Sequence, residues 1–327
     1  MKTRLLLLCF LLTCMYPVFG HHGVASTGVG GLLGPGSPLE TSSSQTLPKG
    51  SFLFYLKLDH ADWKTFTPDR DDEKDSSTFV MAGLGYAPTP YLSFYCFAPF
   101  NAKTVEDNSY NTAGFADISI MGVLGFKYDG GFRLVPAKES LDDLADWHFT
   151  IYTGATLPTG NANTMDSQGN IDPGMALGFG KPSWSIGLTA TKAFLNRFTY
   201  VLDTSYIGFT QNRYADTHTL RFGSEFRINS AFNYRLYTNE NKKLRADLNL
   251  EGGYLGLGRD VENGAGLDAT GGSIVYLLPG VRLYVKNISF AVGVKFPVYT
   301  ALNESVAQQG AEGKERLRLI FSVSTLF

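Results

Sequence analysis

The sequence has few cysteines and, beyond its first residues, no long apolar run. Two of its three cysteines, Cys9 and Cys14, lie near the start, so only Cys96 remains downstream and no internal disulfide is expected there. After residue 20 no segment approaches the roughly 18 to 20 apolar residues that a membrane-spanning helix needs. A formal net charge of −2 gives no sign of nucleic-acid binding. The nucleotide-binding Gly-Lys motif is also missing, and no cofactor is expected.

The N-terminus has the pattern of an export signal. Lys2 and Arg4 precede an apolar stretch at 5–12, and Val18-Phe19-Gly20 offers a cleavage site. We therefore predict a signal peptide at 1–20 and a mature chain that starts at His21. The following segment, 21–50, is rich in Gly, Ser, Thr and Pro and shows no regular period, which predicts a loose lead-in or a partly ordered plug.

What the chain has in quantity favours β-structure. It contains 36 Gly, 17 Tyr and 24 Phe, and its near-zero mean hydropathy fits either an exported globule or a transmembrane barrel. Apolar residues that alternate with polar ones predict about twelve strands. They lie near 52–62, 77–87, 91–101, 113–128, 147–157, 175–191, 197–210, 218–236, 243–257, 271–285, 287–298 and 314–327.

The connections between these strands distinguish a transmembrane barrel from an exported globular protein. Short turns such as APTP (87–90) and TNEN (238–241) alternate with long polar segments such as QNRYADTH (211–218). Outer-membrane barrels have short periplasmic turns and long outer loops, whereas a β-sandwich has no reason to sort its loops in this way. We therefore predict that residues 51–327 form a transmembrane antiparallel β-barrel in the outer membrane, with membrane lipid around it.

The last strand, LRLIFSVSTLF (317–327), has apolar residues at alternate positions and ends on Phe327. This ending resembles the assembly signal that barrel insertion machinery recognises in outer-membrane proteins. The resemblance implies that Phe327 takes part in assembly.

Charged residues on the other face of the strands are the candidate lining of a solute path. Two interpretations remain open for them: a mildly cationic, water-filled path for polar or anionic solutes, or cross-strand ion pairs that fill a narrow interior. The set consists of Lys57, Asp59, Asp117, Lys127, Asp203, Arg221, Glu225, Arg227, Arg235, Arg245, Asp247, Glu251, Lys295, Arg316 and Arg318.

Histidines suggest two further kinds of site. A free amine at His21 beside His22 is able to chelate copper or nickel, although an unstructured end is the simpler interpretation. An outer-membrane hydrolase needs a nucleophile beside a histidine, and His60, His148 and His218 have no recognisable nucleophile motif near them.

Several stretches resemble the outer-membrane proteins grouped under the MetA pathway of phenol degradation, which are distantly similar to long-chain fatty acid transporters. The resembling residues are TLPKGSF (46–52), ATLPTGN (155–161), GFGKPSWSIGLTATK (178–192) and the terminal strand. The resemblance implies a barrel that passes small organic compounds. The leading hypothesis is thus a passive outer-membrane channel for small organic or ionic solutes. A structural or surface-interaction barrel with a closed lumen is the alternative, and an outer-membrane enzyme is the third.

Overall fold

The computed structural model describes residues 36–63, 76–104, 111–136, 144–165, 169–195, 197–303 and 315–327. Within these ranges no helix has the length and apolar character to cross a membrane. The predicted signal peptide, His21 and His22 lie outside the described residues.

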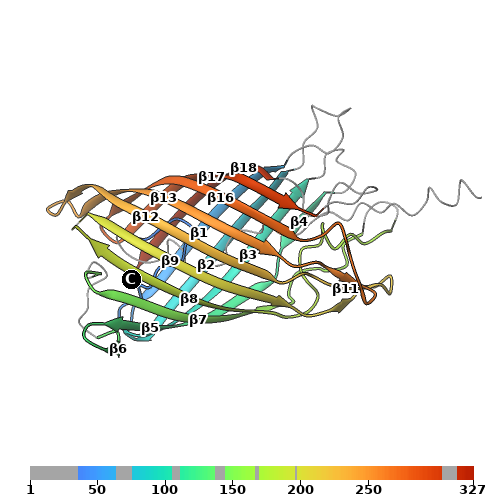
Figure 1. Ribbon diagram of the computed structural model, residues 1–327, viewed down its shortest axis with the longest axis horizontal. Coiled ribbons are helices and arrows are strands. Elements are labelled where there is room, and N and C mark those ends of the chain that lie inside the picture. The colour runs from blue at the N-terminus through green and yellow to red at the C-terminus, as the bar shows by residue number, and fades with distance from the viewer. Residues whose placement is uncertain are drawn as a thin grey trace, which may run out of the picture.

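Twelve long antiparallel strands close into a barrel, as the alternating sequence predicted (Figure 1). Each strand pairs with its neighbour in sequence, and β1–β18 and β3–β5 pairings complete the ring. The strands are β1 (Phe52–Trp63), β2 (Ser76–Thr89), β3 (Leu92–Thr104), β5 (Ile118–Tyr128), β7 (Trp147–Leu157), β8 (Ser183–Phe194), β9 (Phe198–Phe209), β12 (Glu225–Asn239), β13 (Leu244–Leu257), β16 (Gly272–Val285), β17 (Ile288–Leu302) and β18 (Glu315–Leu326).

Six short strands lie at the two ends of the barrel. At the end that carries β4 and β11, called the long-loop end, a small sheet has the order β10-β11-β14-β15. The opposite end, called the short-turn end, carries β6 and the C-terminus (Figure 1). The short strands are β4 (Thr112–Phe115), β6 (Phe132–Leu134), β10 (Asn212–Arg213), β11 (Thr219–Arg221), β14 (Val261–Glu262) and β15 (Ala265–Gly266).

The two faces of the wall follow from the period of two in the strands. In β1, Phe54 and Leu56 are 39% and 41% exposed, whereas Tyr55 and Lys57 between them are 2% and 1% exposed. Successive side chains of a strand point to opposite faces, so the exposed face of β1 is apolar and its buried face combines charged residues with Leu53 and Tyr55. Beside β1, β2, β3, β5 and β7 the interior holds an apolar cluster. An apolar outer face is what lipid around a barrel requires.

Three predicted strands differ from the alternation. The stretch predicted at 113–128 is divided into β4 and β5, with residues 116 and 117 outside both strands. The stretch predicted at 175–191 becomes a strand only from Ser183. The stretch predicted at 218–236 is interrupted between β11 and β12, where a side chain on Gly223 would collide with the carbonyl of Gly258. The Gly223 amide instead donates to Asp260 at 2.6 Å. This close crossing of two backbones ends the regular pairing and starts the barrel strand at Glu225.

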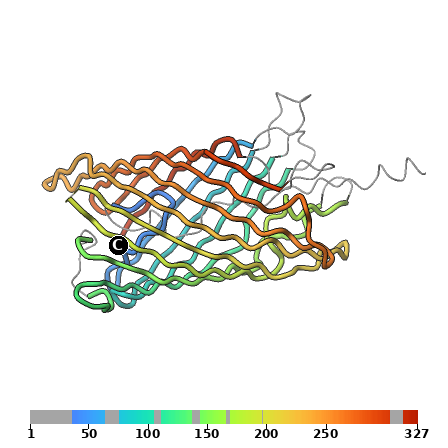
Figure 2. The backbone as a smooth tube through the Cα atoms, in the orientation of Figure 1, coloured from blue at the N-terminus to red at the C-terminus, as the bar shows by residue number. Residues whose placement is uncertain are grey.

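Figure 2 shows that the first described residues enter the interior of the barrel at the short-turn end before the chain joins β1. The first and last barrel strands also pair at the short-turn end. The Phe52 amide donates to the Phe327 carbonyl at 3.0 Å, and the Phe327 amide donates to the Phe52 carbonyl at 2.8 Å. The backbone of the last residue thus completes the pairing of β1, while the residue as a whole is 72% exposed.

Candidate functional site

Residues 36–47, called the plug, lie inside the barrel and are buried along their whole length. The polar run TSSSQT (41–46) is included, with Ser42 and Ser44 both at 0% exposure. No β-pairing holds these residues, so their backbone polar groups need side-chain partners from the wall. The wall supplies such partners from β8, β12, β13 and β16.

The carboxylate of Glu251 on β13 receives three consecutive backbone amides of the plug, and Asp247 accepts from the Gly36 amide at 3.0 Å. The Leu39 amide donates to one oxygen, the Thr41 amide donates to the other at 2.8 Å, and the Thr41 hydroxyl adds a third bond at 2.7 Å. The Glu40 amide lies between both oxygens at 3.3 and 3.2 Å. A carboxylate is an acceptor only, and bonds to a charged acceptor are among the stronger ones in proteins. Glu251 is therefore the main polar anchor of the plug.

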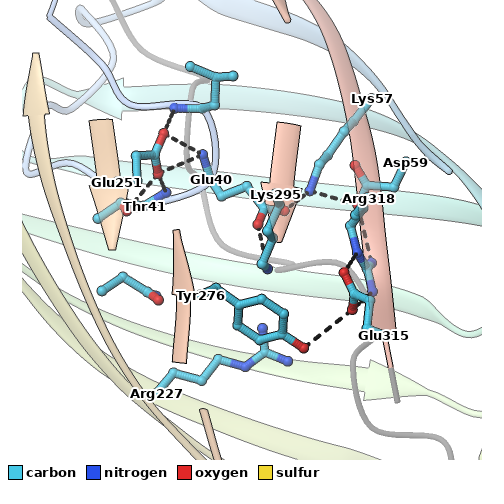
Figure 3. Close-up of polar contacts among 12 residues, drawn as sticks. Glu40, Thr41, Lys57, Asp59, Arg227, Glu251, Tyr276, Lys295, Glu315 and Arg318 are labelled. Atoms are coloured by element: carbon cyan, nitrogen blue, oxygen red, sulfur yellow. Dashed lines mark hydrogen bonds and ion pairs between the residues drawn. The ribbon is translucent and has the colours of Figure 1, made fainter. Parts of the chain in front are cut away.

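One charged side chain of the plug, that of Glu40, forms ion pairs with the wall. Glu40 accepts from Lys57 Nζ at 2.6 Å and from Lys295 Nζ at 2.7 Å, so it joins β1 to β17 (Figure 3). Lys57 also lies 3.1 Å from Asp59, and Arg318 extends the row to Glu315 at 2.8 Å. Glu40 thus bridges two lysines from separate strands.

Three other wall side chains hold the carbonyls at the start of the plug. Asn233 donates to the Gly36 carbonyl at 2.7 Å, Asn249 to that of Ser37 at 3.3 Å, and Arg282 to that of Pro38 at 2.9 Å. Farther along, the Ser44 amide donates to the Thr191 hydroxyl at 2.8 Å. The backbone of the plug is therefore satisfied by donors and acceptors that the strands present inward.

Leucines provide the apolar anchorage. Leu39 is fully buried against Leu278, Ala291 and Ile320. A side chain on Gly280 or Gly293 would collide with Leu39, since an added Cβ would lie 2.7 or 2.6 Å from its Cδ2 atom. Burial of a leucine side chain contributes about 1.5–3 kcal/mol. The two glycines make the space that this leucine fills.

Glu40 gives the plug a defined response to acid. Burial opposes its ionisation, but Lys295, Lys57 and Arg318 outweigh burial and hold its pKa well below the usual 4.5. A carboxyl group with a depressed pKa stabilises the docked state above its undocked pKa, and this contribution is lost as the pH falls through the docked pKa.

We therefore expect acid to remove the Glu40 contribution only at a pH well below the usual 4.5. The difference in planar-bilayer conductance between the native protein and the Glu40→Gln variant should be unchanged between about pH 7 and pH 5 and should shrink only under stronger acid. A difference that already shrinks between about pH 7 and pH 5 would show that Glu40 does not hold the plug in this way.

Most of the charged residues predicted from the alternation do point inward. Arg227 and Lys295 keep 11% and 14% side-chain exposure, and Arg235 is partly buried as well. The buried members are Lys57, Asp59, Asp117, Lys127, Asp203, Glu225, Arg245, Asp247, Glu251 and Arg318. Their role in a solute path stays a prediction.

Asp117 serves the loops at the long-loop end. Its two oxygens accept from the Gly160 amide and the Phe179 amide, both at 2.7 Å. This buried carboxylate holds together two segments that follow β7, and one of them lies in the stretch predicted as a strand from 175. Asp117 is thus an anchor for loop backbone.

Two inward assignments need correction. Arg221 is exposed on β11, in the small sheet outside the barrel wall. Arg316 is exposed because the pairing of β1 with β18 shifts between Asp62 and Trp63, which turns Glu315 inward in its place.

The ion pairs also differ from those expected. Glu225 with Arg227, Asp247 with Arg245, and Asp59 with Lys57 are pairs within one strand, two residues apart. Glu40, Glu315 and Arg282 join the inward set and two arginines leave it, so the set holds eight cations and eight carboxylates and has lost the cationic excess that the alternation suggested.

A small cavity lies between the plug and strands β12, β13, β16 and β17. Its lining includes Thr41, Arg227, Tyr276 and Lys295, and Lys295 Nζ lies 4.4 Å from the centre of the Tyr276 ring. The cavity offers about 30 Å³ for the centres of water molecules, which is room for about two waters. The docked plug therefore leaves little space beside Arg227.

Metal-ligand clusters and curated relatives add no assignment. Among the described residues no three His, Cys, Asp or Glu side chains gather as a metal site. No curated protein sequence matches the chain.

A family model decides the classification. The model described as "MetA-pathway of phenol degradation" matches residues 37–304, which include the plug and most of the barrel. The chain belongs to this family. The match confirms the resemblance read from the sequence, and with the lipid-type outer face of the barrel it places this family member in the outer membrane.

A solved structure agrees with the fold. The COG4313 outer membrane channel from Pseudomonas putida F1 has a TM-score of 0.67 at 16% identity, over 87% of this chain and 98% of that one. At this identity the likeness concerns the barrel fold. A FadL homologue from Pseudomonas aeruginosa matches with a TM-score of 0.44 at 11% identity, over 96% and 99% of the two chains.

Proposed function

We propose that the protein is a passive outer-membrane channel for small organic solutes, aromatic compounds among them, and that the plug narrows its short-turn end. The observation that carries the proposal is the plug itself. It fills the interior through hydrogen bonds, ion pairs and leucine packing, all of which are reversible. A segment that shares no strand pairing with the wall suits a pathway that opens, because it can undock without breaking the pairing of the barrel strands.

Membership of this family supports small organic compounds as the solutes. The family's description refers to phenol degradation, and the Pseudomonas putida relative of similar fold is described as an outer membrane channel. Water-filled barrels admit solutes by the size and charge of their lining. Arg227 and Lys295 keep partial exposure beside the plug, so a solute that passes an undocked plug would meet their charges.

A structural barrel with a closed lumen is the second candidate. The buried ion pairs and the small cavity favour it, because a packed interior stiffens the wall without passing anything. The two candidate functions differ in whether a path through the barrel opens when the plug undocks.

The hydrolase hypothesis has one group of side chains to consider. Thr78 Oγ1 lies 2.9 Å from His60 Nδ1, and Asp62 lies 3.5 Å from the other ring nitrogen. However, His60 and Thr78 face each other in the regular β1–β2 ladder. The ladder engages the backbone amides that an oxyanion hole would need. We therefore propose no hydrolytic reaction for this group.

Arg227→Leu separates the two main candidates, and Arg221→Leu is its matched control. In a channel, loss of the Arg227 charge should lower the preference for anions over cations by roughly twofold or more, because the charge lies beside the pathway. Arg221→Leu should leave selectivity unchanged, since Arg221 lies outside the wall. Reversal potentials in a salt gradient measure this preference.

A closed structural barrel predicts a different result for the same variant. Without Arg227, Glu225 is left poorly paired, at a cost of about 1–3 kcal/mol. Unaltered selectivity together with a lower unfolding midpoint would favour the structural barrel over the channel.

A further inference from the structure

We propose that the short-turn end carries a binding pocket for small organic anions, distinct from the plug site. Its lining includes Arg197, Arg235, Lys243, Arg245 and Lys286, with Tyr284 as an aromatic wall. These residues come from the turns between β8 and β9, β12 and β13, and β16 and β17, and from the strand ends beside them. The proposal concerns binding and does not depend on transport.

Backbone hydrogen bonds bring the cations together. The Arg235 amide donates to the Arg197 carbonyl at 2.8 Å, and the Lys286 amide donates to the Lys243 carbonyl at 2.8 Å. Each bond joins the backbones of two basic residues from neighbouring hairpins. Lys243 also has a left-handed backbone, with φ of 47°, which lets the chain turn sharply at this point. Like charges repel, so the arrangement is more favourable with an anion among them.

The charged residues that line the pocket are mostly cationic. Glu240 is the one carboxylate among its described lining residues, and it is exposed. Arg245 is already paired with Asp247 at 2.7 Å, whereas Lys243 and Lys286 are exposed side chains at the pocket rim. The barrel interior, by contrast, pairs cations with buried carboxylates of the wall and of the plug. The two lysines are therefore the groups most available to an incoming anion.

The size and the wall of the pocket favour an organic anion. Its volume of about 470 Å³ lies within the range of small-molecule sites. Tyr284 is 7% exposed, and the Arg245 guanidinium carbon lies 5.8 Å from the centre of its ring. A planar aromatic carboxylate is able to place its ring against Tyr284 and its charge among the lysines.

The pocket adjoins the beginning of the plug. A Cβ added to Gly36 would lie 2.8 Å from Thr199 Oγ1 and 3.6 Å from Arg245 Nη2, and both Thr199 and Arg245 also line the pocket. A solute that leaves the barrel past the plug would therefore reach these cations next.

Calorimetry on the full-length, detergent-solubilised protein tests the proposal. The probes are benzoate, inorganic phosphate and benzyl alcohol. We expect saturable binding of benzoate, weaker binding of phosphate, and no saturable binding of benzyl alcohol. The double variant Lys243→Gln/Lys286→Gln should weaken benzoate binding by about tenfold, because it removes two partly exposed charge contacts. Lys242→Gln is the control, since Lys242 is exposed on the same turn but is not part of the lining.

Three results would overturn the assignment. Absence of saturable benzoate binding would remove the site. Equal affinity of the double variant, the control and the native protein would show that the lysines do not form it. Benzoate that binds no better than phosphate would contradict the assignment to organic anions. None of these results depends on conductance, so the channel proposal is tested separately.

Discussion

Replacement of Glu251 by glutamine should release the plug while the barrel stays assembled. The native carboxylate accepts from the amides of Leu39 and Thr41 and from the Thr41 hydroxyl. An amide side chain keeps one acceptor oxygen and turns the other position into a donor that faces backbone N–H groups. Loss of such charge-assisted bonds weakens docking by about 3 kcal/mol, roughly a hundredfold in the ratio of docked to free plug.

Cysteine labelling measures this release directly. Ser43 is 1% exposed in the docked plug, so Ser43→Cys, in a background that carries Cys96→Ala, should react slowly with a polar maleimide. Adding Glu251→Gln should raise the rate by about a hundredfold, because labelling follows the population of the open state. Glu262→Gln, on a short strand of the long-loop end, should leave the rate unchanged. Equal rates in the two glutamine variants would show that Glu251 does not anchor the plug.

Replacement of Lys57 by methionine should destabilise the whole protein more than any surface change. Lys57 is 1% exposed and neutralises Glu40 at 2.6 Å and Asp59 at 3.1 Å. Removing one partner of a buried ion pair costs about 3–5 kcal/mol, because the remaining charge has lost its compensation. The urea midpoint of the heat-sensitive gel shift should fall accordingly.

Two companion variants make the Lys57 result specific. Lys49→Met removes an exposed lysine and should change stability by no more than about 0.5 kcal/mol. Combining Lys57→Met with Glu40→Gln and Asp59→Asn should recover much of the loss, since no unpaired carboxylate then remains. If Lys57→Met is as stable as Lys49→Met, the row of charges around Glu40 contributes little to stability.

Period-two alternation was sufficient to predict the twelve strands and the inward direction of residues such as Lys57 and Glu251. It depends on local geometry alone, in which a strand turns every second side chain to one face. The sorted loop lengths then distinguished a membrane barrel from a sandwich. Both signals lie within single strands or single junctions of the sequence.

Where the prediction failed, the cause lay in contacts between distant segments. Arg316 turns outward because of a register shift against β1, and Arg221 lies outside the wall because two backbones cross at Gly223. The plug has no period to reveal it, and its anchor Glu251 lies 210 residues away from Thr41. Period and composition contain no information on such pairings.

Single-channel conductance of the purified protein in a planar bilayer tests the central claim, that the barrel is a channel narrowed by its own plug. The comparison is between the native protein and a variant that lacks residues 23–45 but keeps the signal and cleavage region. We expect both proteins to show the heat-sensitive gel shift of an assembled barrel. We also expect the variant to give conductance steps several-fold larger than the native protein. If both proteins assemble and show the same conductance, or none, the plug does not restrict a pathway and the channel account is wrong.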